Sequence, residues 1–150
     1  MKILAVDYGR VRTGLAVCDP SEMLATPLAV VRETDPERLA QSVAETAKAQ
    51  GARQIVVGHP VNMDGTEGES AQRARQFASL LKTQSALPVV LRDERGTTVT
   101  AHQYLNKTDT RGKKRKAVVD AVAATIILQN YLDYRKNHPE QSQEGQNGLQ

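Results

Sequence analysis

Residues 2–18 read KILAVDYGRVRTGLAVC, and this stretch decides the class of fold. Two short apolar runs flank a glycine-containing turn, a pattern typical of a tight β-hairpin whose first strand ends in Asp7. A third extended segment, 23–31, follows a turn and contains Pro27, which favours an edge strand or a bulge. The chain therefore opens with a predicted antiparallel meander of three strands.

Downstream of the meander, helices alternate with strands. The first helix is predicted between the capping residues Asp35 and Pro36 and a glycine stop at Gly51. The later segments predicted from apolar periodicity are strands at 54–57 and 88–91 and helices at 69–82, 97–105 and 117–134. Strands separated by helices pair in parallel. The expected fold is α/β, a mixed five-stranded sheet with helices packed on it.

Composition limits the class of protein. The chain has 150 residues, 39% of them hydrophobic and 25% charged, which is ordinary for one globular domain and excludes wholesale disorder. We expect a domain over 1–136 and a polar, disordered tail over 137–150. No apolar stretch is long enough for a membrane span, and the single Cys18 allows no internal disulfide, so we expect a cytoplasmic protein. The net charge of +3 is too small to indicate a nucleic-acid partner by itself.

Three acids are candidates for a metal site. Asp7 ends the first predicted strand, Glu94 follows the last one, and Asp120 interrupts the most apolar helix. Parallel strands bring their carboxyl ends to one edge of the sheet, where converging carboxylates would bind Mg²⁺ or Mn²⁺ and support phosphodiester hydrolysis. Taken singly, each acid also has a purely structural explanation: a turn for Asp7, a solvated run of charges for Glu94 and a helix end for Asp120. The position at the strand end favours Glu94 over its neighbour Asp93 only weakly.

Polar and basic residues nearby are candidates for nucleic-acid contacts. Asn62 and Thr66 lie in a turn-rich loop that either binds phosphate or is an ordinary turn. His59, just before this loop, either assists proton transfer or has no role in the chemistry. The segment 106–116 is predicted to be a polar loop, either solvated or in contact with a phosphate backbone, and it contains Lys113, Lys114, Arg115 and Lys116. Aromatic residues are few, and Tyr8 is the one we nominate for stacking on a base.

Four ordered motifs resemble the YqgF (RuvX) family of bacteria. They are Val6 to Ala16 (VDYGRVRTGLA), Val57 to Thr66 (VGHPVNMDGT), Asp93-Glu94-Arg95 and Val119-Asp120-Ala121. The resemblance implies a ribonuclease H-like fold, a cytoplasmic location and a nuclease that processes the 16S ribosomal RNA precursor. It places the acidic trio on Asp7, Glu94 and Asp120. We also expect the motif arginines Arg10, Arg12 and Arg95 to contact nucleic acid.

The sequence departs from the family pattern in two places and leaves several readings open. His59 stands where the family usually has leucine, and Gly96 replaces a leucine or similar residue. Ala123 and Ala124 stand where RuvC-type enzymes offer a fourth carboxylate, so one-metal and two-metal catalysis both remain open. The alternatives to an RNA nuclease are a Holliday junction resolvase, which needs a homodimer, and a nucleic-acid-binding module of weak activity. An actin-like ATPase is disfavoured because such proteins need two domains.

Overall fold

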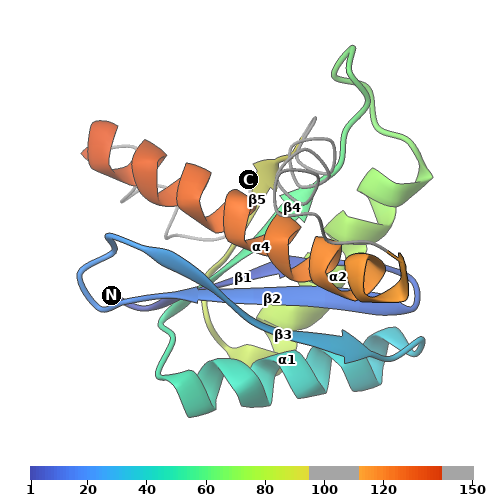
Figure 1. Cartoon of the computed structure of the whole chain (residues 1–150), viewed down its shortest axis with the longest axis horizontal. Helices are drawn as coiled ribbons and strands as arrows, with labels where there is room; N and C mark the ends of the chain where they lie inside the picture. The colour runs from blue at the N-terminus through green and yellow to red at the C-terminus, as the bar shows by residue number, and fades with distance from the viewer. Residues whose placement is uncertain (95–111, 140–150) are drawn as a thin grey trace.

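The computed structural model describes residues 1–94 and 112–139, with the backbone alone for 112–120. The elements in chain order are β1 (Ile3–Asp7), β2 (Arg12–Cys18), β3 (Ala25–Arg32), α1 (Pro36–Gln50), β4 (Gln54–His59), α2 (Glu69–Ser85), β5 (Val89–Asp93) and α4 (Gly112–Asn137). Figure 1 shows α4 crossing one face of the sheet, with α1 below the strands and α2 behind them. The helix predicted at 97–105 falls outside the described residues.

The five strands form one mixed sheet in the order β3-β2-β1-β4-β5. The pairs β1–β2 and β2–β3 are antiparallel, and β1–β4 and β4–β5 are parallel, which confirms the predicted meander followed by parallel strands. The register of β2 and β3 shifts near Pro27, the bulge that this proline favours in an edge strand. The carboxyl ends of β1, β4 and β5 therefore meet at one edge of the sheet.

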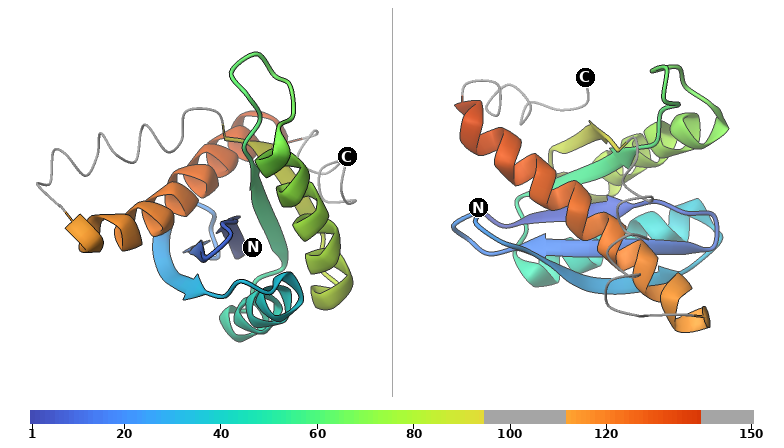
Figure 2. Two further views of the ribbon diagram at one scale, coloured as in Figure 1. Left: turned by 90° about the vertical axis from the view of Figure 1, so that its right-hand side faces the viewer. Right: turned by 45° about the horizontal axis from the view of Figure 1, so that its top comes forward.

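Hydrophobic side chains fill both faces of the sheet, in two clusters. One lies between the sheet and helices α1 and α2 and includes Leu4, Val6, Ile55 and Leu81. The other lies under α4 and includes Ile3, Ala5, Val56, Ile127 and Leu128. Figure 2 shows the helices on opposite sides of the strands. No helix among the described residues is long and apolar enough to cross a membrane.

The helix boundaries agree with the sequence prediction at α1 and differ from it at the start of α4. Helix α1 begins at the predicted cap, where the Asp35 side chain accepts a hydrogen bond from the Glu37 backbone N–H, and it ends at Gly51 with φ of 73°. Helix α4 begins at Gly112, so the prediction of a polar loop up to residue 116 is wrong. Lysine and arginine are good helix formers. The basic run at 113–116 is therefore helical because it continues into the apolar segment that follows it, despite the repulsion between its like charges.

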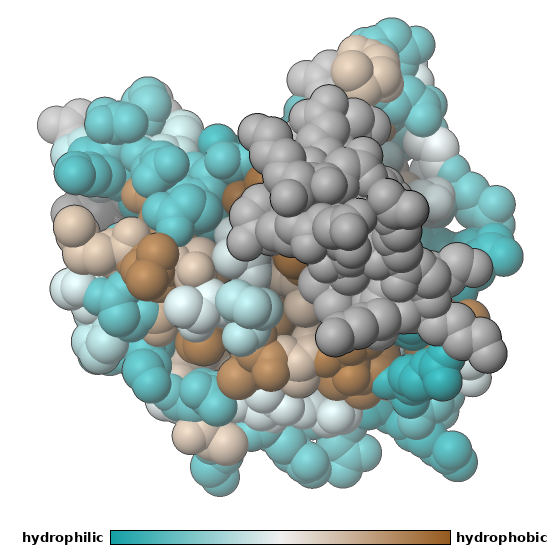
Figure 3. Space-filling view, in the orientation of Figure 1, coloured by the Kyte–Doolittle hydropathy of each residue, from teal (hydrophilic) through white to brown (hydrophobic). Residues whose placement is uncertain are grey.

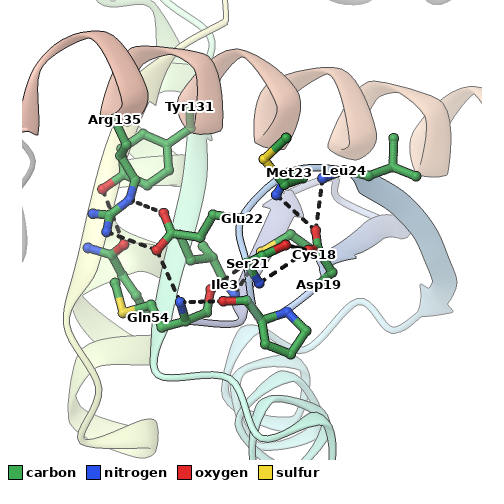
Figure 4. A network of polar contacts seen from close by, with 12 residues as sticks. Ile3, Cys18, Asp19, Ser21, Glu22, Met23, Leu24, Gln54, Tyr131 and Arg135 are labelled. Atoms are coloured by element: carbon green, nitrogen blue, oxygen red, sulfur yellow. Dashed lines mark hydrogen bonds and ion pairs between the residues drawn. The ribbon is translucent and has the colours of Figure 1, made fainter.

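A polar network holds the C-terminal half of α4 against the strands (Figure 4). The Arg135 guanidinium donates from Nε to Glu22 Oε1 at 2.6 Å, joining α4 to the β2–β3 connection. The Tyr131 hydroxyl donates to Gln54 Oε1 on β4 at 3.2 Å. Gln129 accepts from the Ala25 N–H at 3.0 Å. These contacts fix the position of α4 across the sheet.

Candidate active site

The turn after β1 fixes the end of the strand that carries Asp7. A Cβ at Gly9 would lie 2.1 Å from the carbonyl oxygen of Arg12, so the turn closes only with glycine there. The Gly9 N–H donates to the Thr13 hydroxyl at 3.3 Å, and Thr13 is fully buried. Side chains alternate along a strand, and Ile3 and Ala5 face α4, so Asp7 faces α4 as well.

Glu94 reaches the same face from the end of β5. Its backbone N–H donates to the carbonyl oxygen of His59 at 3.2 Å, which ties it to the neighbouring end of β4. A Cβ at Gly58 would lie 2.6 Å from Glu94 Oε2 and 2.7 Å from Ile127 Cδ1. The missing side chain at Gly58 thus leaves the space that the Glu94 carboxyl group occupies. The sequence patterns did not single out this role.

The Asp7 and Glu94 carboxyl groups share a hydrogen bond. Burial, and next the charge of Asp7, raise the pKa of Glu94 to about 9, with Asp93 adding a smaller repulsion. Two acids in such contact hold a proton between them or require a cation. Hard carboxylate oxygens suit Mg²⁺ or Mn²⁺, so the residues present fit the expected metal.

The third predicted acid lies on α4, and its side chain is outside the described ones. Position 120 precedes Ala124 by four residues and Ile127 by seven, spacings that share one face of a helix. Both of those residues are buried against the sheet. Among the described side chains, no three acids, histidines or cysteines cluster as metal ligands, so the structure brings together two members of the predicted trio.

Comparison with known proteins places this arrangement in a family. The RuvX family model, described as Holliday junction resolvase, matches residues 1–134. The chain belongs to the RuvX family. A relative from Anaeromyxobacter dehalogenans, named "Putative pre-16S rRNA nuclease", is 46% identical over 138 residues, covering 90% of this chain and 98% of the relative. A relative of the same name from Rhodopirellula baltica is 42% identical over 132 residues, covering 88% and 76% of the two chains.

Solved structures support the RuvX fold. Thermus thermophilus RuvC aligns with a TM-score of 0.56 at 16% identity, covering 91% of this chain and 97% of RuvC. The Fowlpox virus resolvase, solved with Holliday junction DNA, aligns with a TM-score of 0.54 at 14% identity, covering 89% and 98% of the two chains. At these identities the likeness shows the fold alone, and it confirms the expected ribonuclease H-like class.

The loop that carries the RuvX motif NMDGT closes on itself. Asn62 Nδ2 donates to the Thr66 hydroxyl at 2.9 Å, and the Asn62 backbone N–H donates to the Thr66 carbonyl at 2.8 Å. The Thr66 hydroxyl in turn donates to Asp64 at 2.6 Å. Both Asn62 and Thr66 are exposed. The motif therefore builds an exposed loop, held by its own hydrogen bonds, beside the end of β4.

His59, at the end of β4, anchors this loop. Its Nε2 lies 3.1 Å from Glu67 Oε2, and Glu67 also pairs with Arg75 on α2. The His59 ring thus joins the end of β4 to the far side of the loop and to a helix. This contact gives His59 a structural partner, and Glu67 and Arg75 were not singled out by the sequence motifs.

Three of the other predicted contact residues, Tyr8, Arg10 and Arg12, lie in the β1–β2 turn or at the start of β2. Arg10 is exposed and pairs with Glu69 at 3.4 Å. Arg12 lies in β2, opposite Arg32 of β3. Tyr8 stacks on Phe77 with ring centroids 4.4 Å apart, so one of its faces packs against α2. Residues 113–116 form the first turns of α4, with side chains outside the described ones, and Arg95 and Gly96 also lie outside the described residues.

Proposed function

We propose that this RuvX protein is a metal-dependent nuclease that cleaves the precursor of 16S ribosomal RNA in the cytoplasm. The observation that carries the proposal is the contact between the Asp7 and Glu94 carboxyl groups at the carboxyl ends of parallel strands. The names of the relatives support the substrate. Asp7, Glu94 and Asp120 would hold Mg²⁺ or Mn²⁺, with Asp120 approaching from α4.

A bound divalent cation would supply an activated water and neutralise charge on the scissile phosphate. The protein's own residues prepare that site. Gly58 leaves room for Glu94, and the His59 carbonyl oxygen holds the Glu94 backbone in place. Because burial and the charge of Asp7 favour a proton on Glu94, binding of a metal by this carboxylate would release that proton. Metal affinity therefore rises with pH.

Basic residues around this edge would hold the RNA backbone. We propose that Arg10, Arg12 and Arg95 contact phosphates near the cleavage site, and that Asn62 and Thr66 approach from the exposed loop. Lys113, Lys114, Arg115 and Lys116, in the first turns of α4, would extend the contact. Such contacts recognise backbone and shape rather than base sequence.

A second candidate, resolution of branched DNA, is favoured by the family description and by the RuvC-like fold. A resolvase must cut two symmetric strands, and we expect it to act as a homodimer with two copies of this site. The RNA nuclease needs only one site. The oligomeric state and the cleavage pattern therefore separate the two candidates.

The test compares cleavage of an end-labelled fragment of precursor 16S rRNA with cleavage of a synthetic four-way DNA junction. Each substrate is incubated with Mg²⁺, Mn²⁺ or EDTA. We expect metal-dependent cuts in the RNA and none in EDTA. Paired symmetric nicks in the junction would support the resolvase, and binding of both substrates without cleavage would show a nucleic-acid-binding module.

A further inference from the structure

A hollow of about 550 Å³ lies between the first turn of α1, the middle of α2 and the residue that follows β1. Figure 2 shows the two helices side by side, on the face of the sheet opposite α4. Apolar and polar side chains both line the hollow, among them Tyr8, Phe77 and Leu80 on the apolar side and Glu37, Arg73 and Gln76 on the polar one. Apolar walls with a few polar groups are typical of a site for a small organic group.

The hollow lies beside the edge of the sheet that carries the acidic pair. Tyr8 directly follows Asp7, and side chains alternate along a strand, so Tyr8 points away from α4 and packs on the opposite cluster. Its ring stacks on Phe77 of α2, with centroids 4.4 Å apart and planes inclined by 8°. An RNA strand bound at Asp7 would therefore cross only the end of β1 to reach the hollow.

Two arginines next to this hollow share one oxygen atom of a carboxylate. Arg10, in the turn after β1, and Arg73, in the lining, both donate to Glu69 Oε1, Arg10 from Nη2 at 3.4 Å. The side chains of Arg10 and Glu69 are 67% and 72% exposed, so water weakens this contact and another anion can compete for it. One negative charge thus lies against two positive ones, an arrangement that suits a phosphate group with several acceptor oxygens.

We propose that the hollow receives one nucleotide of the substrate RNA, whose phosphate replaces the Glu69 carboxylate on Arg10 and Arg73. This inference rests on the proposed nuclease function and adds a second contact for its substrate. A nucleobase has apolar faces and hydrogen-bonding edges, which match the apolar wall at Leu80 and the amide of Gln76.

The charge pattern favours a nucleotide over a peptide. Glu37 makes the interior of the hollow unfavourable for an anion, while the Arg10–Arg73 pair favours one at its margin. A nucleotide matches this division, because its base is neutral and its phosphate carries the charge. An acidic peptide would meet repulsion at Glu37, and a basic one at the two arginines. Figure 3 shows that the surface over the connection between β4 and α2, at the upper right, is largely hydrophilic, which also suits a polar ligand.

The first test measures equilibrium binding in EDTA of a fluorescein-labelled, unstructured RNA of about 12 nucleotides. Arg73→Gln should weaken binding about tenfold, because it removes charged hydrogen bonds to the phosphate. Arg75→Gln is the matched control, since it removes another arginine of α2 that pairs with a glutamate but does not line the hollow. It should weaken binding by less than about threefold. Equal losses in the two variants would overturn the phosphate site.

Glu69→Gln should act in the opposite direction. It should tighten RNA binding about threefold, because the carboxylate that competes with the phosphate is lost. Glu45→Gln, in the C-terminal half of α1, removes the same charge away from the hollow and should change binding less. A protein that has lost its fold cannot bind RNA more tightly, so this result does not depend on the stability of a variant. Weaker or unchanged binding by Glu69→Gln would contradict the proposal.

The place of the base is tested with an abasic ribose-phosphate oligomer of the same length. Gln76→Ala should weaken binding of the RNA about fivefold and leave the abasic oligomer unchanged. An equal effect on both, or on neither, would show that no base enters the hollow. Wild-type binding by Arg73→Gln, together with metal-dependent cleavage by the unmodified protein, would overturn this site alone. Binding that depends on Arg73, without any cleavage, would overturn the nuclease function alone.

Discussion

Gly58→Ala should remove most of the activity by displacing Glu94. The new Cβ would lie 2.6 Å from Glu94 Oε2, 2.7 Å from Glu94 Cδ and 2.7 Å from Ile127 Cδ1, whereas carbon contacts lie at about 3.5–4.0 Å. Because Ile127 is buried in the cluster under α4, the Glu94 carboxyl group is the easier of the two to move, by about 1 Å. A misplacement of this size can cost about a hundredfold in rate.

The assay is kcat/KM for metal-dependent RNA cleavage, together with thermal unfolding to verify the fold. Overpacking should lower the stability by about 1–3 kcal/mol, which a stable domain tolerates. Gly68→Ala is the matched control, since its Cβ would meet no atom closer than 3.6 Å. Wild-type cleavage by a folded Gly58→Ala protein would refute the placement of Glu94 in the site.

Three further predictions concern stability. Glu94→Gln should raise the Tm measured without metal at pH 7–8 and flatten the fall of Tm with rising pH. Because the pKa of Glu94 is raised, the stabilisation that this group gives at acid pH is lost as pH rises from about 4.5 to about 9. A Tm profile parallel to that of the wild type would contradict this. Arg135→Ala should cost about 2 kcal/mol in a urea titration and remove part of the acid sensitivity. Burial raises the pKa of Glu22, but the hydrogen bonds and charges of Arg135 and the N-terminal ammonium together outweigh burial and lower it, so the contribution of Glu22 is lost as pH falls below about 4.5. An unchanged midpoint would argue against the network. Gly9→Ala should destabilise the protein by about 3 kcal/mol or prevent folding, because its Cβ would meet the Arg12 carbonyl oxygen at 2.1 Å, and a normal Tm would show that the turn has another geometry.

Local patterns were enough to predict the sheet. The helix caps at Asp35 and Gly51 and the bulge at Pro27 depend on neighbours in the sequence, and they agree with the structure. The strands were placed correctly, but their ends differ from the predicted ones by up to two residues. The start of α4 was missed because the basic run at 113–116 has the composition of a solvated loop. Its helical conformation comes from continuity with the buried apolar segment that follows.

The candidate site was predictable in part. Asp7 and Glu94 could be nominated because parallel strands share an edge, but the choice of Glu94 over Asp93 needed the alternation of β5 in its final register. The role of Gly58 depends on a side chain from the end of another strand, and the contact of the Arg92 guanidinium with the Tyr134 ring joins residues more than 40 positions apart. Contacts of this kind leave no local pattern in a single sequence.

The role of the Asp7–Glu94 pair in cleavage is tested by comparing three single variants in the RNA cleavage assay. Asp7→Asn and Glu94→Gln each remove one carboxylate of the pair, and Asp93→Asn removes the exposed acid next to it in the sequence. We expect the first two variants to lose metal-dependent cleavage while still binding RNA in EDTA, and Asp93→Asn to cleave within a few-fold of wild type. Full cleavage by Asp7→Asn or by Glu94→Gln would contradict it.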